Sequence, residues 1–418
     1  MFEARRVEMA LSGKAGLWLG IGRAAEQAAY GSAMLVLAAR MTVREFGSIA
    51  TLFVINSVVL TLSDLGVAHD IVRTPNNVLY PVRGVHIQRV VNAILAFISI
   101  AVGLLISGDA GLLILIGGML WAVGGEAYVR QAAALRLGKI RRLVAIDFGL
   151  AAVFILLIVF LASPTHALTV VGMSLILHHL LVVVLLPIGS AAIGPTSLDS
   201  RPFGFLLNHS LGYITRNIDY ILAGPLLGPS AFSSYVLGFR VANAPTAPLG
   251  SIVLRWGLTR FAAESAEERE LTHRRAAVLL IAAGCLGMCL TLLLAIALPW
   301  AIGDRWRMAA SVSIILALAL PWRMIDGLIG AVGFSSNSDV LLNRFEIFRI
   351  ALTLAGLLVG GQFGLGGFVG AATSLNILLI AFGHLLVSRS AGLTPSRVVL
   401  LSAPLLTGLA LLLSAVVF

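Results

Sequence analysis

The sequence predicts an all-α protein that crosses a membrane many times. Apolar stretches of about twenty residues, the length of helix that spans a bilayer core, recur from just after Lys14 to Phe418. Of the 418 residues, 59% are hydrophobic and only 11% are charged, and the mean hydropathy is +1.00. A soluble domain carries roughly 25% charged residues. We therefore expect a polytopic membrane protein rather than a water-soluble fold.

Short polar or glycine-containing breaks divide the chain into about thirteen segments of spanning length. We predict helices over residues 15–39, 46–68, 88–107, 110–128, 143–162, 167–187, 203–226, 230–256, 275–301, 308–331, 345–361, 365–387 and 397–417. The connections at 163–165 and 364–367 are so short that the helices they join must be antiparallel.

The first segment is expected to be a membrane helix rather than a secretory signal. Arg23, Glu26 and Gln27 lie near its middle, and the apolar region of a signal peptide does not tolerate such residues. Cys285 and Cys289 lie in one apolar segment, where free cysteines usually pack as small apolar side chains. We therefore expect neither a disulfide framework nor a metal site, and no cofactor.

Lysine and arginine residues are concentrated in alternate loops, which fixes the orientation. Cytoplasmic loops carry an excess of these residues, and the bias is consistent if the amino terminus is cytoplasmic. The charged stretch at 262–275 then reads as a solvated cytoplasmic helix or loop. Asp64, Glu126 and Asp147 lie near the same side, where we expect loop arginines to contact them. The net charge of +10 thus reflects membrane topology, and we expect no nucleic-acid partner.

The chain divides into two lobes of six helices. We assign an N-lobe to 1–188, a cytoplasmic linker to 189–202, a C-lobe to 203–390 and one additional helix to 391–418. An even number of helices in each lobe gives a parallel repeat, related by a pseudo-twofold axis along the membrane normal. Transport between two such lobes is the natural use of this symmetry.

Several short motifs resemble a known family. They are LAARMTVREFG at 37–47, LSDLGV at 62–67, IVR at 71–73, NIDYILAG at 217–224 and GLGG at 364–367. Together they resemble the polysaccharide transporters, which are lipid-linked oligosaccharide flippases of the multidrug/oligosaccharidyl-lipid/polysaccharide exporter superfamily. The resemblance implies a fold like that of the multidrug exporters (MATE-like) and alternating access.

Ionisable residues inside the predicted spans are the main functional candidates. Each costs about 2.5 to 3.5 kcal/mol to insert and is by default functional, with a partner to be named. Four pairs are spaced i, i+3, namely Arg23 with Glu26, Arg216 with Asp219, Arg323 with Asp326, and Glu346 with Arg349. Residues at this spacing share one helix face. The pairs could be local ion pairs that lower the cost of insertion, or parts of a site.

Three arginines are the predicted substrate-binding residues: Arg23, Arg216 and Arg240. A guanidinium stays protonated and forms charge-assisted, often bidentate hydrogen bonds to phosphate. The resemblance implies that these side chains line a cavity between the lobes and bind the pyrophosphate of a polyprenyl-pyrophosphate glycolipid.

Two further roles are assigned to residues in the spans. Glu26, Asp219 and Asp326 are candidates for coupling to an H⁺ or Na⁺ gradient, although the nearby arginines could simply pair with them. Pro245 and Pro248 remove backbone hydrogen bonds and bend the helix that holds them. They form either a hinge or a static kink, and Pro321 could play the same part.

The sequence predicts a flippase rather than an enzyme. Phosphate loops, nucleophile elbows and long loops with paired carboxylates are lacking. We expect a bacterial inner-membrane protein that translocates a lipid-linked oligosaccharide, for example of O-antigen, with surrounding lipid and the polysaccharide polymerase machinery as partners. One alternative is a cation-coupled multidrug exporter of the same superfamily. Another is a membrane-embedded polymerase or ligase of lipid-linked sugars.

Overall fold

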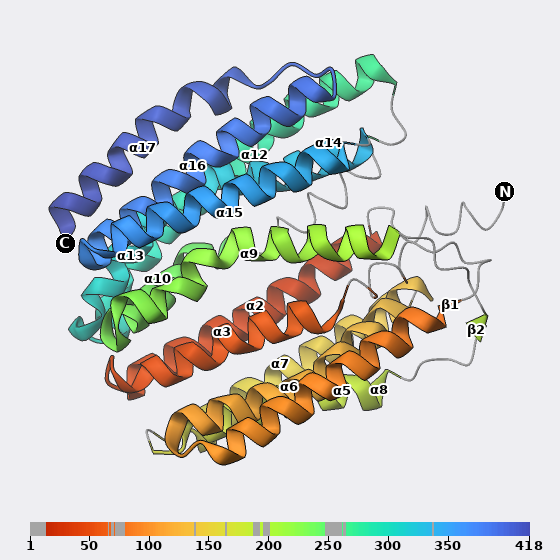
Figure 1. The fold of residues 1–418 in the computed structure, drawn as a ribbon. Coiled ribbons are helices and arrows are strands. Elements are labelled where there is room, and N and C mark those ends of the chain that lie inside the picture. The colour runs from red at the N-terminus through yellow and green to blue at the C-terminus, as the bar shows by residue number, and fades with distance from the viewer. Residues whose placement is uncertain are drawn as a thin grey trace. The chain divides into compact units, whose positions relative to one another are not determined.

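The protein is an all-α polytopic membrane protein, as the sequence predicts. A computed structural model describes residues 14–65, 67, 71, 80–137, 139–163, 165–186, 193–194, 201–246, 261, 265–336 and 338–418. Each of the predicted spans contains a helix over most of its length. The chain forms two compact units, which are Met1–Met41 with Ser48–Ser210, and Thr42–Gly47 with Leu211–Phe418 (Figure 1).

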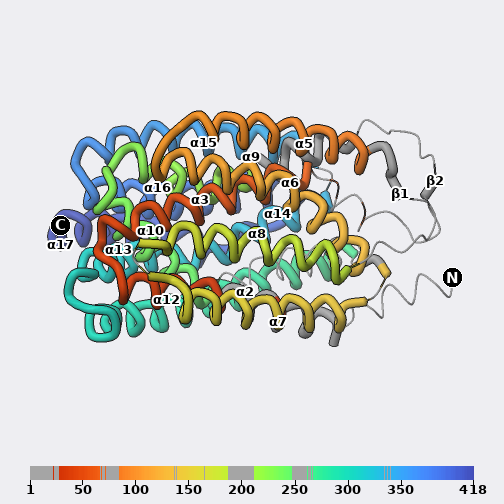
Figure 2. Tube along the Cα trace, turned by 90° about the horizontal axis from the view of Figure 1, so that it is seen from below, coloured from red at the N-terminus to blue at the C-terminus, as the bar shows by residue number. Residues whose placement is uncertain are grey.

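The first unit is a bundle of helices in which consecutive helices run in opposite directions. Its elements are α2 (Lys14–Arg40), α3 (Glu45–Ser63), α5 (Val82–Leu105), α6 (Gly108–Arg136), α7 (Ile140–Leu161) and α8 (Ala167–Leu185), with β1 (Tyr80–Pro81) paired in parallel to β2 (Ile193–Gly194). Helices α5 and α6 lie side by side along their length (Figures 1 and 2). The turn between them contains Gly108 at φ +75°, a conformation that glycine adopts without steric cost.

The second unit holds the described helices that follow, with α9 entering it at Leu211. They are α9 (Arg201–Leu227), α10 (Pro229–Asn243), α12 (Ala266–Ile302), the 3₁₀ turn η1 (Asp304–Trp306), α13 (Arg307–Ala317), α14 (Leu320–Ser335), α15 (Asp339–Gly361), α16 (Gly364–Ser390) and α17 (Arg397–Val417). The charged stretch that we interpret as cytoplasmic begins α12. There Ser265 and Glu268 form a reciprocal capping box, which satisfies two backbone N–H groups that the helix start leaves unpaired.

Membrane-spanning length is confirmed for most of the predicted segments. Among the described residues, eight helices are long and apolar enough to cross a membrane. Helices α13 and α14 make a further span that is bent by 50°. Helices α9 and α15 carry several of the ionisable residues singled out in the sequence.

Two predicted helices are interrupted where proline occurs. The segment at 308–331 is not one straight helix, since α13 ends at Ala317 and α14 begins at Leu320. Pro321 occupies the first turn of α14, where its missing N–H removes no hydrogen bond. The segment at 230–256 is helical as far as Asn243 and continues as a turn through Thr246. Pro245 therefore lies in a turn, and Pro248 lies outside the described residues.

The interior of the second unit is apolar around α14. One cluster of buried side chains there includes Trp322, Ile325 and Leu328 from α14 and Ile380 from α16. Helix α12 approaches the start of α14 very closely, because a Cβ atom added at Gly284 would lie 2.4 Å from the Cα atom of Pro321. This packing fixes the start of α14, directly before its ionisable residues Arg323 and Asp326.

Candidate functional site

Ionisable side chains from α9 and α14 pair across the two helices rather than along them. Arg216 on α9 lies 3.9 Å from Asp326 on α14. In return, Arg323 on α14 lies 3.9 Å from Asp219 on α9. The i, i+3 spacing places each arginine and carboxylate on one helix face, as predicted. The interpretation as local ion pairs is therefore wrong for these residues, because each partner comes from the other helix.

Asp219 is the most enclosed carboxylate of this network. Its side chain is 2% exposed. The hydroxyl of Tyr235 on α10 donates to Asp219 Oδ2 at 2.6 Å, and the backbone N–H of Tyr220 donates to Oδ1 at 2.8 Å. Both carboxylate oxygens are therefore satisfied, as the cost of burying a charge requires.

Arg323 connects α14 to the end of α10. Its Nη1 donates to Asn243 Oδ1 at 2.5 Å, and its guanidinium lies over the ring of Phe239 at 5.3 Å from the centroid. Asn243 in turn donates to the carbonyl of Phe239 at 2.7 Å. The last turn of α10, directly before Pro245, is thus held by a charged side chain from another helix.

Arg349 on α15 is the most buried arginine of the network, at 2% exposure. Its Nη1 lies 2.7 Å from Asp326 Oδ1, and its Nη2 donates to Asn376 Oδ1 on α16 at 3.4 Å. Glu346, one turn earlier on α15, lies 3.8 Å from Nη1. Of the predicted i, i+3 pairs whose side chains the structure describes, Glu346 with Arg349 is the one that forms within a single helix.

The network has more positive than negative groups. Arg216, Arg240, Arg323 and Arg349 accompany the three carboxylates Asp219, Asp326 and Glu346. Arg240 lies over the ring of Tyr220 at 5.4 Å from the centroid, and its Nη2 donates to the tyrosine hydroxyl at 3.4 Å. The side chain of Arg216 is 53% exposed, so this guanidinium is available to a ligand.

The structure brings together only part of the predicted site. Arg216, Arg240, Asp219 and Asp326 all lie in the second unit, where Arg216 contacts Asp326 while Asp219 and Arg240 belong to a neighbouring group of contacts around Tyr220. The side chains of Arg23 and Glu26 lie outside the described residues, as does Pro248.

Sequence reasoning missed several members of this network. It assigned no role to Tyr235, Asn376 or Phe239, which are uncharged, and it named Glu346 and Arg349 only as one of the four pairs, without a specific role. Helical spacing could have suggested Tyr235, which precedes Phe239 by four residues and so shares its face. Nothing in the sequence places Asn376 beside Arg349.

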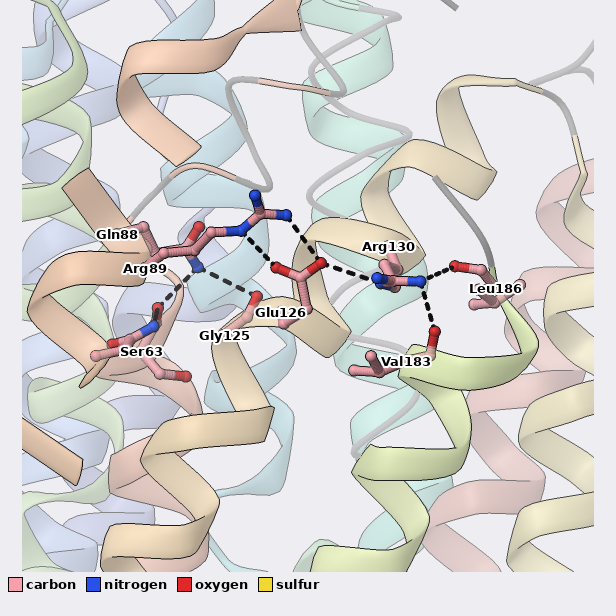
Figure 3. Close-up of polar contacts among 9 residues, drawn as sticks. Ser63, Gln88, Arg89, Gly125, Glu126, Arg130, Val183 and Leu186 are labelled. Carbon is pink, nitrogen blue, oxygen red and sulfur yellow. Dashed lines mark hydrogen bonds and ion pairs between the residues drawn. The ribbon is translucent and has the colours of Figure 1, made fainter. Parts of the chain in front are cut away.

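The first unit contains a separate arginine cluster at the end where α5 begins and α6 and α8 end (Figure 3). Arg89 forms two hydrogen bonds to Glu126, at 2.9 and 3.0 Å. Arg130 also donates to Glu126, at 3.0 Å, and its Nη1 donates to the carbonyls of Val183 and Leu186 at 2.6 and 3.3 Å. The predicted contact of Glu126 with arginines is confirmed.

These contacts satisfy backbone groups as well as charges. The last carbonyls of a helix have no partner within the helix, and cations there interact favourably with the helix dipole. Arg130 from α6 and Arg142 from α7 both donate to carbonyls at the end of α8. Beside them, Gln88 donates to the carbonyls of Ser63 and Gly125 (Figure 3). The arginine cluster of the first unit therefore stabilises helix ends. We take the network of the second unit as the candidate site.

Comparison with solved structures gives the fold class of the chain, which is that of MATE transporters of the MOP superfamily. An inward-facing multidrug resistance MATE transporter matches with a TM-score of 0.66 at 13% identity, over 88% of this chain and 96% of that one. An outward-facing structure matches with a TM-score of 0.63 at 14% identity, over 92% and 97%. A MOP superfamily transporter from Pyrococcus furiosus, described as having a binding pocket of reverse polarity, gives 0.58 at 14%, over 91% and 98%.

The chain belongs to the family of polysaccharide biosynthesis proteins, whose sequence model matches residues 36–311. The resemblance to polysaccharide transporters of this superfamily, seen in short motifs, is therefore confirmed at the level of family and fold. No curated protein matches the sequence.

Proposed function

We propose that this transporter translocates a polyprenyl-pyrophosphate-linked oligosaccharide, such as an O-antigen unit, across the bacterial cytoplasmic membrane by alternating access. Family membership supports a role in polysaccharide biosynthesis, and the fold supports transport. In this proposal, the pyrophosphate binds the arginines of the second unit while the polyprenyl tail stays in lipid.

The exposed guanidinium of Arg216 is the observation that carries this proposal. It is 53% exposed and lies 3.9 Å from Asp326, which is longer than a hydrogen bond. If Arg216 turns toward a ligand, Asp326 still has Arg349 as a partner, because Arg349 Nη1 lies 2.7 Å from Asp326 Oδ1. A phosphate can therefore bind Arg216 without leaving Asp326 as a buried, unpaired charge, the most costly outcome for such a group.

Arginine suits this ligand better than lysine would. The planar guanidinium donates two parallel hydrogen bonds to phosphate oxygens and keeps its charge when partly desolvated. Arg240, whose guanidinium lies over Tyr220, would provide a second cation in the same unit. Arg23 stays a predicted contributor from the first unit.

Replacing Arg216 tests the proposal. Arg216→Ala should abolish display of the surface glycan and cause the lipid-linked precursor to accumulate on the cytoplasmic face of the membrane, with unchanged abundance of the protein. Arg216→Lys should retain only part of the activity, because the ammonium keeps the charge but not the bidentate geometry. Precursor accumulation and glycan display would be measured in the same cells.

A matched control is Arg307→Ala, which removes an exposed arginine whose partner, Asp304, lies one turn away at 3.1 Å. That variant should export normally. Normal glycan display in the Arg216→Ala variant would refute the proposed role of the network.

A multidrug exporter is the second candidate, favoured by the structural likeness to multidrug resistance MATE transporters. The two functions make opposite demands on charge, since a cationic drug would be repelled by a network with an excess of arginine. Cells that lack the protein should therefore lose glycan display but keep their resistance to cationic drugs. The reverse result would establish the drug exporter.

A further inference from the structure

Two neighbouring aromatic rings of the candidate site each contact an arginine. The rings of Tyr220 on α9 and Phe239 on α10 have centroids 5.0 Å apart and planes tilted by 32°. Arg240 lies over the ring of Tyr220, and Arg323 lies over the ring of Phe239, at 5.4 and 5.3 Å from the centroids. Both rings are buried, and the attraction of a cation for a ring face is stronger where water is excluded. The two guanidiniums therefore share one aromatic pair.

Arg323 is attached to the same turn of α10 that carries Arg240. Its Nη1 donates to Asn243 Oδ1 at 2.5 Å, and Asn243 Nδ2 donates to the carbonyl oxygen of Phe239 at 2.7 Å. Helix α10 ends at Asn243, and the chain continues as a turn that contains Pro245. No further helical turn secures this end of α10, so its position depends on contacts with other helices.

Asp219 does not compete for the directional contacts of Arg323. Arg323 Nη2 lies 3.9 Å from Asp219 Oδ2, which is longer than a hydrogen bond. This nitrogen is buried and has no hydrogen-bond partner in the part of the chain that the structure describes. The oxygens of Asp219 instead accept from Tyr235 and from the backbone of Tyr220. Asp219 therefore balances the charge of Arg323, while α10 determines its orientation.

We propose that Arg323 is a positioning residue for Arg240. It holds the last turn of α10 through Asn243 and Phe239 and so fixes where the Arg240 guanidinium lies. The inference rests on the proposed function, in which Arg240 provides a second cation for the pyrophosphate. Arg323 is only 14% exposed, against 53% for Arg216, so contact with the ligand is assigned to the other arginines.

The benefit of such positioning is preorganisation. Two guanidiniums bind the two phosphates of one ligand most tightly if their separation is already set, because ordering them on binding costs free energy. A long arginine side chain at the end of a helix that is followed by a turn would otherwise be free to move with that end.

Fluorine NMR tests the positioning without any ligand. The full-length protein in lipid would carry 3-fluorotyrosine at position 220, where the hydroxyl accepts from Arg240 Nη2 at 3.4 Å. Arg323→Met keeps an unbranched side chain but removes the charge and the donors. It should shift the fluorine resonance in the direction that Arg240→Met shifts it, and it should add little shift to the Arg240→Met protein. A resonance that Arg323→Met leaves unchanged would overturn the proposal.

Binding of inorganic pyrophosphate tests the consequence. Arg323→Met and Asn243→Ala should each weaken binding by roughly tenfold, a usual size for coupling between separate sites. The double variant should bind no more weakly than either single variant, because both changes break the same connection. Arg323→Lys should retain most of the affinity, since an ammonium still donates to Asn243 and lies over Phe239. Unchanged or tighter binding in Asn243→Ala would overturn the positioning role, because Arg323 would then act on the ligand directly.

Gly360→Ala in α15 is the control for a loss of stability alone. Its added Cβ atom would lie 2.6 Å from the carbonyl oxygen of Gly367, so the variant strains the same unit at a contact away from α10. It should leave the fluorine resonance and the pyrophosphate affinity unchanged. A loss of affinity equal to that of Arg323→Met would show that Arg323 is merely structural and would overturn the proposal.

The two measurements separate this inference from the proposed function. If the unaltered protein binds no pyrophosphate, or if Arg216→Ala binds it equally well, the proposed binding of the substrate is refuted. The fluorine resonance still decides whether Arg323 positions Arg240. If pyrophosphate binds and depends on Arg216, but Arg323→Met changes neither measurement, the positioning role alone is overturned.

Discussion

Asp219 is buried in the second unit together with its hydrogen-bond donors. The shortest of its contacts is the 2.6 Å bond from the hydroxyl of Tyr235. A hydrogen bond to a charged group contributes about 1.5 to 3 kcal/mol, and removing the donor leaves the acceptor to bear its desolvation cost. At the scale of single residues, stability therefore depends on side chains that lie in the candidate site.

Tyr235→Phe removes this donor without changing the ring. We expect the free energy of unfolding to fall by about 1 to 3 kcal/mol, measured as a lower midpoint of thermal unfolding of the detergent-solubilised protein. Tyr220→Phe is the matched variant, because its hydroxyl makes only a 3.4 Å contact with Arg240. Equal midpoints for the two variants would show that the bond to Asp219 adds little.

Arg349 provides a sharper test of the buried charges. Arg349→Leu leaves Asp326 without its closest partner and should cost about 3 to 5 kcal/mol of stability, the usual cost of breaking a buried pair. The double variant Arg349→Leu with Asp326→Leu removes both charges and should recover most of the loss. Thermal unfolding of the two variants side by side checks this, and a double variant as unstable as the single one would contradict it.

Residue types in this site could be predicted from the sequence, but their partners could not. Arginines and carboxylates in apolar segments stand out because insertion makes them costly. The i, i+3 spacing then suggests local pairs. The actual partners, Arg216 with Asp326 and Arg323 with Asp219, depend on α9 lying beside α14. That proximity is a property of the tertiary fold, and the spacing along either helix carries no information about it.

At the scale of elements, helix positions follow from the length of apolar segments, because a span needs about 20 residues. The interruption between α13 and α14 could not be located in this way, since the apolar pattern runs through it. Pro321 indicates an irregularity, but a proline is equally compatible with a kink inside a helix and with the first turn of a new helix. The structure shows the second arrangement.

Gly284 tests the close packing of α12 on α14. Because its added Cβ would meet the backbone of Pro321 at 2.4 Å, Gly284→Ala should cost about 1 to 3 kcal/mol, as overpacking does. Gly149→Ala in α7 is the control, since nothing lies within 4 Å of the added atom. That variant should gain about 0.5 to 1 kcal/mol from helix propensity. Unfolding midpoints that shift in the same direction would contradict this account.

Pro245 lies in the turn that follows α10, where the N–H of Thr246 donates to the carbonyl of Asn243 at 3.1 Å. If this turn is a hinge, Pro245→Ala should slow glycan export severalfold while leaving the abundance of the protein unchanged. Pro229→Ala, at the start of α10, is the control for loss of a proline elsewhere in the same helix. Unchanged export rates in Pro245→Ala would identify the proline as a static feature.

At the scale of the whole molecule, the predicted orientation in the membrane rests on the distribution of Lys and Arg between loops. The cluster of Arg89, Arg130 and Arg142 lies at one end of the first unit, the end that the positive-inside rule assigns to the cytoplasm. The proposal that the amino terminus is cytoplasmic depends on this distribution, and so does the direction of transport.

Cysteines introduced at Ser163 and Ser390 test this topology. In a background where Cys285 and Cys289 are replaced, a membrane-impermeant thiol reagent added to intact cells should label position 163 and leave position 390 unlabelled. Permeabilised cells should show labelling at both. Labelling of both positions in intact cells would contradict the predicted orientation.

The contacts of Arg130 restrict how the first unit can rearrange. One guanidinium is bonded both to Glu126 on α6 and to two carbonyls at the end of α8. These two helices therefore share an axial register at this end, and neither can slide past the other without breaking the hydrogen bonds of Arg130. In any conformational change of this protein, α6 and α8 must therefore move together as one rigid body.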